Sequence, residues 1–288
     1  MLALEDNHSS RRRPLRVAVA LLSALAVAGV SALALRHGAS PKPVVLVPRA
    51  TTAVTCGQTI IVSIVVGNDL TCPPGTDGLN VGHASITINL NGHTFAGGGN
   101  GYSGIANPGF STVTIENGRV SGWSSGVNAD GPLGKVTGIR ATANTFGIYL
   151  FGTGSSATSN VVWSNSNYGI YFGAPNGKLT SNVARENTFT GIAVTGSGDL
   201  VQTNQSENNG FVGIVDGGVG NTLTGNVSNA NGAGGIDTTG DQTATLTSNT
   251  ANYNTGYGIA GSPGGKDGGG NAAKGNTQAT QCKDVVCA

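Results

Sequence analysis

Residues 180–194 read TSNVARENTFTGIAV, and variants of this stretch recur along most of the chain. Each copy contains a glycine followed by a β-branched aliphatic residue, and successive pairs are 21 to 23 residues apart. The pairs are Gly104-Ile105, Gly126-Val127, Gly147-Ile148, Gly169-Ile170, Gly191-Ile192, Gly213-Ile214, Gly235-Ile236 and Gly258-Ile259. From Gly169 onward, an asparagine lies nine residues before each glycine, and a second asparagine follows the first after five residues. Three markers in one register over five copies indicate a repeat architecture.

The repeat length excludes the main alternatives. Leucine-rich repeats of similar length need leucines at fixed places, and this region has few leucines. Helical repeats are longer, and the glycine and asparagine in every copy would destabilise a helix. We therefore predict an all-β fold, a single-stranded parallel β-helix that forms a solenoid of about 22 residues per coil.

Alternation within each copy predicts which side chains face inward. In the strand that contains Gly147, Ile148 and Leu150 should point inward and Tyr149 outward, because successive strand residues face opposite sides. A second strand contributes one aliphatic residue per coil to another inward column. Its members are Val136, Ala157, Leu179, Val201, Leu223 and Leu246.

The recurring asparagines predict a hydrogen-bonded ladder at one bend. Asparagine tolerates the left-handed conformation and bonds the local backbone. Amides at the same bend of every coil can stack at the strand spacing of about 4.8 Å, each bonding to the next. The predicted ladder consists of Asn160, Asn182, Asn204, Asn226 and Asn249. Asn117 and Gly138 hold the same offset in two earlier coils.

With these residues the chain resembles the pectin-lyase-like superfamily of right-handed parallel β-helices, in particular the short repeats typical of carbohydrate-binding proteins and sugar hydrolases. The resemblance rests on coils such as residues 180–192 and on the first coil, ITINLNGHT (residues 86–94), and it covers residues 55 to 280. It implies a right-handed solenoid. It leaves function open, because one fold hosts many activities.

The first 44 residues have the composition of an export signal. Arg11, Arg12, Arg13 and Arg16 precede an apolar run over residues 17–35. The run is longer than a usual signal core of about 7–15 residues and close to the ~20 that cross a bilayer, so a cleaved signal and a retained anchor both stay open. Sec and twin-arginine export also stay open. Residues 1–44 are thus predicted as signal or anchor with linker, and residues 45–288 as a body that is secreted or anchored on the outer side of the membrane.

Four cysteines lie in this exported part and are predicted to form two disulfides, Cys56–Cys72 and Cys282–Cys287. A metal site would need Cys-x-x-Cys or paired histidines, which are absent, so we expect no metal and no cofactor. The two bridges would close an N-terminal cap, residues 55–82, and a C-terminal cap, residues 262–288, that protect the open ends of the solenoid.

The sequence contains no recognised catalytic motif of the superfamily, so whether the protein is an enzyme stays open. The predicted ligand-binding residues are Tyr149, Tyr171, Phe151, Trp163 and Arg185, because aromatic rings on a flat sheet suit the apolar faces of sugars. A formal net charge of +1 argues against nucleic acid as a partner. We expect a monomeric envelope or extracellular protein that binds polysaccharide on an outer sheet face. The alternative is a lyase or hydrolase of an acidic glycan.

Overall fold

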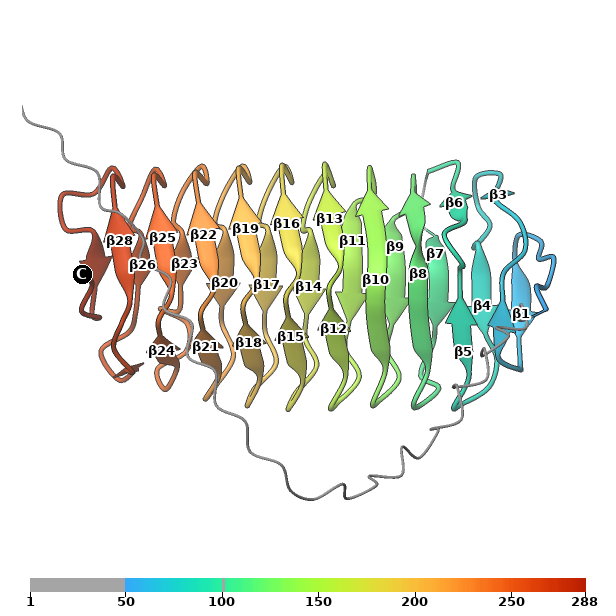
Figure 1. Cartoon of the computed structure of the whole chain (residues 1–288), viewed down its shortest axis with the longest axis horizontal. Coiled ribbons are helices and arrows are strands. Elements are labelled where there is room, and N and C mark those ends of the chain that lie inside the picture. Colours follow the sequence, from blue (N-terminus) through green and yellow to red (C-terminus); the bar gives the residue numbers. More distant parts are fainter. Residues whose placement is uncertain (1–49, 100–101) are drawn as a thin grey trace, which may run out of the picture. The chain divides into compact units, whose positions relative to one another are not determined.

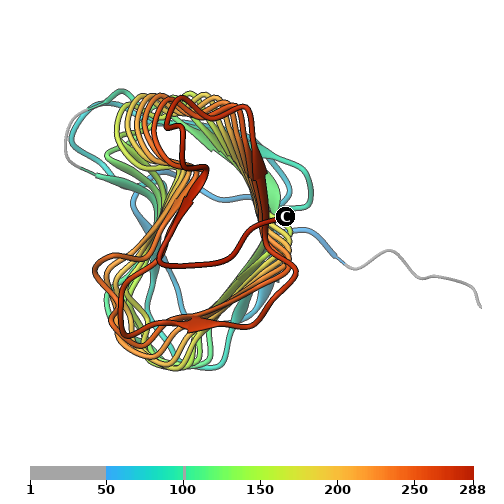
Figure 2. The same cartoon turned by 90° about the vertical axis from the view of Figure 1, so that its left-hand side faces the viewer.

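The computed structural model describes residues 50–99 and 102–288, and the predicted signal or anchor lies outside these residues. The described chain forms short parallel strands that return to the same side of the fold once per coil (Figure 1). Viewed along the axis, successive coils superpose (Figure 2). In these described ranges, no helix is long and apolar enough to cross a membrane.

Sheet 1 contains eleven strands, each hydrogen-bonded to the strand of the next coil. Its strands are β1 (Gln58–Ile60), β4 (Leu79–Val81), β7 (Ser103–Asn107), β9 (Ser125–Ala129), β11 (Phe146–Leu150), β14 (Ile170–Phe172), β17 (Ile192–Val194), β20 (Ile214–Asp216), β23 (Ile236–Asp237), β26 (Ile259–Ala260) and β29 (Cys282–Lys283).

Two further faces complete each coil, and we call them sheet 2 and sheet 3. Sheet 2 contains β2 (Ile64–Val65), β5 (Thr87–Asn89), β12 (Ser156–Thr158), β15 (Lys178–Thr180), β18 (Leu200–Gln202), β21 (Thr222–Thr224), β24 (Thr245–Thr247) and β27 (Lys266–Asp267). Sheet 3 contains β3 (Leu70–Thr71), β6 (Thr94–Ala96), β13 (Val161–Trp163), β16 (Val183–Arg185), β19 (Gln205–Glu207), β22 (Val227–Asn229), β25 (Thr250–Asn252) and β28 (Ala272–Lys274). The longer strands β8 (Thr114–Ser121) and β10 (Lys135–Thr142) run through both faces.

Strand pairing in the sheets places equivalent residues of successive repeats next to each other. In sheet 1, Ile148 pairs with Ile170, and the column continues through Ile192 to Ile214, Ile236 and Ile259. These isoleucines are fully buried, as are the predicted aliphatic residues of sheet 2 from Val136 to Leu223. The prediction of an all-β parallel β-helix with about 22 residues per coil is confirmed.

Asparagine side chains fill the bend between sheets 2 and 3. The Asn160 Nδ2 atom donates to Asn182 Oδ1 at 2.9 Å, and the same bond links Asn182 to Asn204. The chain of bonds continues through Asn226 and Asn249 to Asn271. A second ladder occupies the bend between sheets 3 and 1. Its members are Asn144, Asn165, Asn187, Asn209, Asn231, Asn254 and Asn276.

The register corrects the placement of two earlier residues. Asn117 and Gly138 align with Ser159, the residue before the first ladder asparagine, because Arg140 pairs with both Arg119 and Val161. The ladder position itself is held by Gly118 and by the buried Ile139, whose backbone N–H donates to Asn160 Oδ1. In these two coils only two residues separate the second-ladder position from the marker glycine, as between Asn144 and Gly147. Later coils have three, as between Asn165 and Gly169, and this difference shifts the offset counted from the glycine.

Two disulfides lie near the ends of the described chain. Cys56 is bonded to Cys72 across 16 residues, and Cys282 to Cys287 across five. Residues 55–82 contain β1 to β4, and residues 262–288 contain β27 to β29, so both predicted caps contribute strands to the sheets. Disulfides form in oxidising compartments, so the bridges indicate an extracytoplasmic location for the folded body.

Candidate functional site

Aromatic side chains gather on the outer side of sheet 1 and on the bend that precedes it. They include four of the seven phenylalanines and three of the six tyrosines of the chain. We call this group the aromatic surface: Phe146, Tyr149, Phe151, Tyr168, Tyr171, Phe189 and Phe211. Each ring lies within 6 Å, centroid to centroid, of at least one other member, so the seven rings form one continuous cluster.

Strand pairing sets the centre of this surface. Tyr149 and Tyr171 are register partners in β11 and β14, and their rings stack with centroids 5.2 Å apart. Phe151 follows β11, and its ring lies 5.5 Å from that of Tyr171 with an interplanar angle of 14°. Gly173 provides the room, because a Cβ atom there would lie 2.6 Å from Cε1 of Phe151. A side chain at this position would displace the ring.

A row of rings at the bend extends the surface over four coils. Phe146 stacks on Tyr168 at 5.8 Å, and Tyr168 meets Phe189 edge-on at 5.4 Å. The rings of Phe189 and Phe211 are stacked and nearly parallel, with an interplanar angle of 3° and centroids 4.7 Å apart. They are 38% and 44% exposed, which is unusual for phenylalanine in a soluble domain. Exposed apolar patches of this kind mark binding surfaces.

Polar groups border the rings. Asn128 is the register partner of Tyr149, and its buried Oδ1 atom has no hydrogen-bond partner within the described residues. Partial desolvation raises the pKa of the Asp130 carboxyl. Desolvation also raises the pKa of Tyr149, with smaller contributions from Tyr171 and Asp130. The Tyr149 phenol therefore stays a hydrogen-bond donor at neutral pH.

A polar groove of about 440 Å³ adjoins the row at the bend. Trp123, Ser124, Thr145 and Ser166 contribute to its lining, and Thr145 directly precedes Phe146. The Trp123 ring is buried, and its Nε1 atom donates to Phe95 O. Thr145 and Ser166 thus place hydroxyl groups one and two residues before Phe146 and Tyr168, at the Phe146 end of the row. A ligand with apolar faces and polar edges requires such groups.

The structure separates the predicted ligand-binding residues into two groups. Tyr149, Phe151 and Tyr171 lie together on the aromatic surface. Trp163 and Arg185 are register partners on sheet 3, where the guanidinium carbon of Arg185 lies 5.9 Å from the Trp163 ring centroid. Arg185 also forms an ion pair with Glu186 at 3.1 Å. These two residues form a local contact on another face.

Sequence reasoning missed Phe146, Tyr168, Phe189 and Phe211. The signal that could have found them is an aromatic residue one or two positions before the marker glycine in four successive coils. This signal is hard to see because the distance from the aromatic residue to the marker glycine changes from one to two. A search with a fixed period of 22 residues therefore aligns Phe146 with Tyr168 and Phe189 with Phe211, but not the two pairs with each other.

One protein family matches about half of the chain. Residues 133–280 match the family described as periplasmic copper-binding protein (NosD), and this match covers just over half of the 288 residues. The chain belongs to the NosD family. No protein of curated function matches the sequence of this NosD-family chain.

Solved structures were found that resemble the chain. The NosD-family chain superposes on the Dettilon tailspike protein with a TM-score of 0.52 and 14% identity, over 79% of this chain and 59% of the tailspike chain. The A-module of mannuronan C-5 epimerase AlgE6 from Azotobacter vinelandii gives a TM-score of 0.46 and 18% identity, with 80% of each chain covered. The periplasmic alginate epimerase AlgG gives 0.38 and 12%, over 82% of this chain and 79% of that one. At these identities the tailspike likeness shows the fold alone.

The family description names copper, but the described residues of this NosD-family chain do not suit that metal. Copper sites are built from thiolate, thioether and imidazole ligands. All four cysteines are in disulfides, and the sole methionine, Met1, lies outside the described residues. Residues 50–99 and 102–288 contain no group of three or more His, Cys, Asp or Glu that could hold a metal ion. We therefore derive no copper chemistry from this body.

Proposed function

We propose that this protein is an exported glycan-binding protein that holds a polysaccharide against the aromatic surface of sheet 1. The single observation that carries the proposal is the continuous cluster of seven rings, with Phe189 and Phe211 well exposed. Aromatic faces pack against the apolar C–H faces of sugar rings, while hydroxyl groups at the edges bond to the sugar hydroxyls. A long, open row suits a polymer better than a small enclosed ligand.

The compartment supports the same function. The basic head and apolar run of residues 1–44 indicate export, and the disulfides indicate an oxidising environment. The family description places its members in the periplasm. We propose that the body is released or anchored on the outer side of the membrane, where envelope and extracellular glycans are available to it.

Affinity electrophoresis and calorimetry with a panel of neutral and acidic polysaccharides test this proposal. Tyr171→Ala removes the ring that contacts Tyr149, Phe151, Phe146 and Tyr168. It should weaken binding by about two- to tenfold, since one aromatic contact contributes about 0.5–1.5 kcal/mol. Tyr253→Ala is the matched control, because Tyr253 is 62% exposed and lies outside the aromatic surface.

Two results would overturn the proposal: no retention by any polysaccharide, or equal binding by wild type and Tyr171→Ala. The same mixtures are assayed for unsaturated products at 235 nm and for new reducing ends. Product formation that tracks with the protein would favour the lyase or hydrolase alternative over simple binding.

A further inference from the structure

A second groove lies at the bend between sheets 2 and 3, near the N-terminal end of the solenoid. It has a volume of about 190 Å³, and its lining contains two arginines, three glycines and one asparagine. These residues are Gly92, Asn117, Gly118, Arg119, Gly138 and Arg140. Arg119 and Arg140 are register partners in β8 and β10, so their backbones are one strand spacing apart and both side chains point outward on sheet 3.

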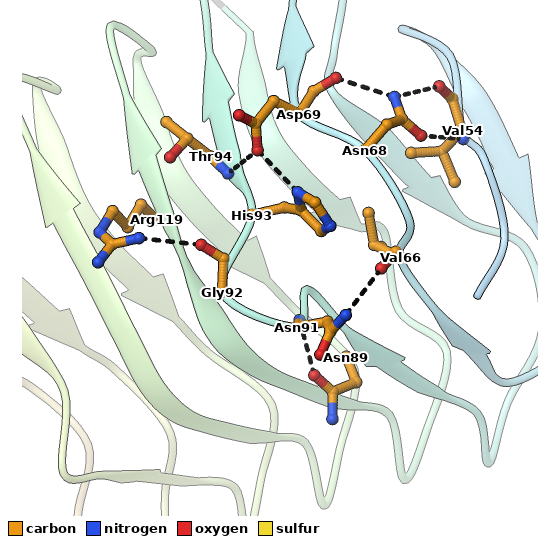
Figure 3. A network of polar contacts seen from close by, with 10 residues as sticks. All are labelled: Val54, Val66, Asn68, Asp69, Asn89, Asn91, Gly92, His93, Thr94 and Arg119. Atoms are coloured by element: carbon orange, nitrogen blue, oxygen red, sulfur yellow. Dashed lines mark hydrogen bonds and ion pairs between the residues drawn. The ribbon is translucent and has the colours of Figure 1, made fainter. Parts of the chain in front are cut away.

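The two arginines are register partners of like charge on neighbouring strands. The Arg119 Nη1 atom donates to the backbone oxygen of Gly92 at 2.9 Å (Figure 3). The described residues give neither arginine an ion pair. Like charges directly opposite each other on neighbouring strands are destabilising. By contrast, Arg185 on the same sheet is paired with Glu186. Two cations held side by side over an open groove are the arrangement that an oxyanion neutralises.

Glycine keeps the groove open. Gly92 has a φ of +83°, and a Cβ atom there would find no atom within 4 Å. Gly138, with a φ of +63°, stands where the next coils carry Ser159 and Ser181 in the same left-handed conformation. A Cβ atom on Gly138 would lie 2.9 Å from Asn117 Oδ1, inside the groove. The space beside the arginines therefore depends on the absence of a side chain at these positions.

The Asp69 carboxylate, in the same region, bonds to other groups. Asp69 Oδ1 contacts His93 Nδ1 at 2.8 Å and accepts the backbone N–H of Thr94 at 2.9 Å. Figure 3 shows the His93 ring and the Arg119 guanidinium on opposite sides of Gly92, with Asp69 on the His93 side. Asp69 is thus engaged mainly by Thr94 and His93, and Arg119 makes only the smallest of the contributions that lower the pKa of the Asp69 carboxyl.

We propose that this groove binds an oxyanion of an acidic polysaccharide, a uronate carboxylate that the guanidinium groups of Arg119 and Arg140 clamp between them. A planar guanidinium matches a carboxylate with two parallel hydrogen bonds. The groove has room for one such group, and the net charge of +1 provides no extended basic field of the kind that duplex nucleic acid requires. The site lies on sheet 3, so it is independent of the aromatic surface on sheet 1.

Binding of sodium polygalacturonate to the full chain at low ionic strength, measured by calorimetry and thermal shift, tests the proposal. We expect wild type to bind and to gain melting temperature, whereas Arg140→Gln should weaken binding about tenfold or more. Without the polymer, Arg140→Gln should melt at or above the wild-type temperature because it relieves the repulsion with Arg119. Arg185→Gln is the matched control on the same sheet and should bind like wild type.

A second variant tests whether binding depends on the open space of the groove as well as on the charge of the arginines. Gly138→Ser introduces the residue that Ser159 already carries at this bend, so it should fold, and its side chain should reduce polygalacturonate binding with both arginines in place. Neither groove variant should change the binding of a neutral polysaccharide to the aromatic surface, which keeps the test distinct from that of Tyr171→Ala. Equal binding by wild type and both groove variants would overturn the proposal. So would binding of inorganic sulfate or phosphate without polygalacturonate, or tighter binding of duplex DNA at the same salt concentration.

Discussion

Asp216 occupies the inward position of β20 that Leu150, Phe172 and Val194 hold in the three preceding coils. Its Oδ1 atom accepts hydrogen bonds from Gly218 N and Asn221 Nδ2, but its Oδ2 atom is buried without a partner in the described structure. Burial raises the pKa of this carboxyl to about 6. A carboxylate at an aliphatic position therefore destabilises the folded state when it is ionised.

The Asp216→Asn variant should reveal this cost through pH. The pKa of Asp216 in the folded protein lies above its ordinary value of 3.8. The stability that the protonated side chain contributes is therefore present at low pH and is lost as pH rises through about 6. The loss corresponds to at most about 3 kcal/mol. Asparagine keeps the Oδ1 acceptor without the charge, so the variant should melt higher than wild type at pH 8 and close to wild type at pH 4.5.

Thermal unfolding followed by circular dichroism at the two pH values measures this difference. Asp237→Asn in the next coil is the control, because Asp237 lies on the outer side of β23 and accepts bonds only from Thr239. A gain in melting temperature for Asp216→Asn that is the same at both pH values would contradict the assignment.

At the scale of the element, each bend contains a strained left-handed residue and a hydrogen-bonded asparagine that offsets the strain. In the bend between sheets 2 and 3 the residue before each ladder asparagine is left-handed, including Ser159, Ser181 and Thr203 with φ between +53° and +56°. Such conformations are uncommon outside glycine and cost free energy. The asparagine that follows offsets this cost, since its amide bonds both to the preceding coil and to the next. The ladder thus stabilises a bend that the backbone alone disfavours.

Asn204→Leu should expose this dependence. The Asn204 side chain donates to Leu179 O and Asn226 Oδ1 and accepts from the backbone and side-chain amides of Asn182. Leucine leaves these buried groups unpaired at about 1–3 kcal/mol each, so we expect a clear fall in denaturant midpoint. Gln205→Leu, at an exposed neighbouring position, should change stability little. Equal midpoints for Asn204→Leu and wild type would show that the ladder is dispensable.

The repeat could be predicted because inward positions recur with a fixed chemistry. Gly147-Ile148 and its equivalents fix the column of sheet 1, and Val136 to Leu246 fix that of sheet 2. The last rung, Asn271, escaped sequence analysis because no marker glycine follows it. The sequence predicts that the ladder asparagine itself is left-handed, whereas in the structure the residue directly before the asparagine is left-handed. Phe189 and Phe211 escaped because bend residues tolerate a shift of one position that strand residues, with alternating faces, do not.

At the scale of the whole solenoid, each coil contacts only its two neighbours, so the first and last coils must bury one face without a further coil. At the C-terminal end, β27, β28 and β29 pair with β24, β25 and β26. The Cys282–Cys287 disulfide closes this last coil, and a bridge between Asn271 and Cys287 holds the tail across it. An exposed strand edge in this position would be a template for pairing with another chain.

Deletion of residues 261–288 should therefore cause concentration-dependent self-association beyond that of the intact chain. The deletion removes β27 to β29 and uncovers Leu246, Ala251 and Ile259, which are buried in the intact chain. Unpaired edges and an apolar face would then meet in a second copy. Sedimentation velocity at several concentrations measures the effect. The double variant Cys282→Ser, Cys287→Ser keeps all three strands and should stay monomeric, which assigns protection to the strands rather than to the disulfide. A truncated chain that remains monomeric up to high concentration would show that the penultimate coil protects its own edge, and the C-terminal segment would then need another explanation.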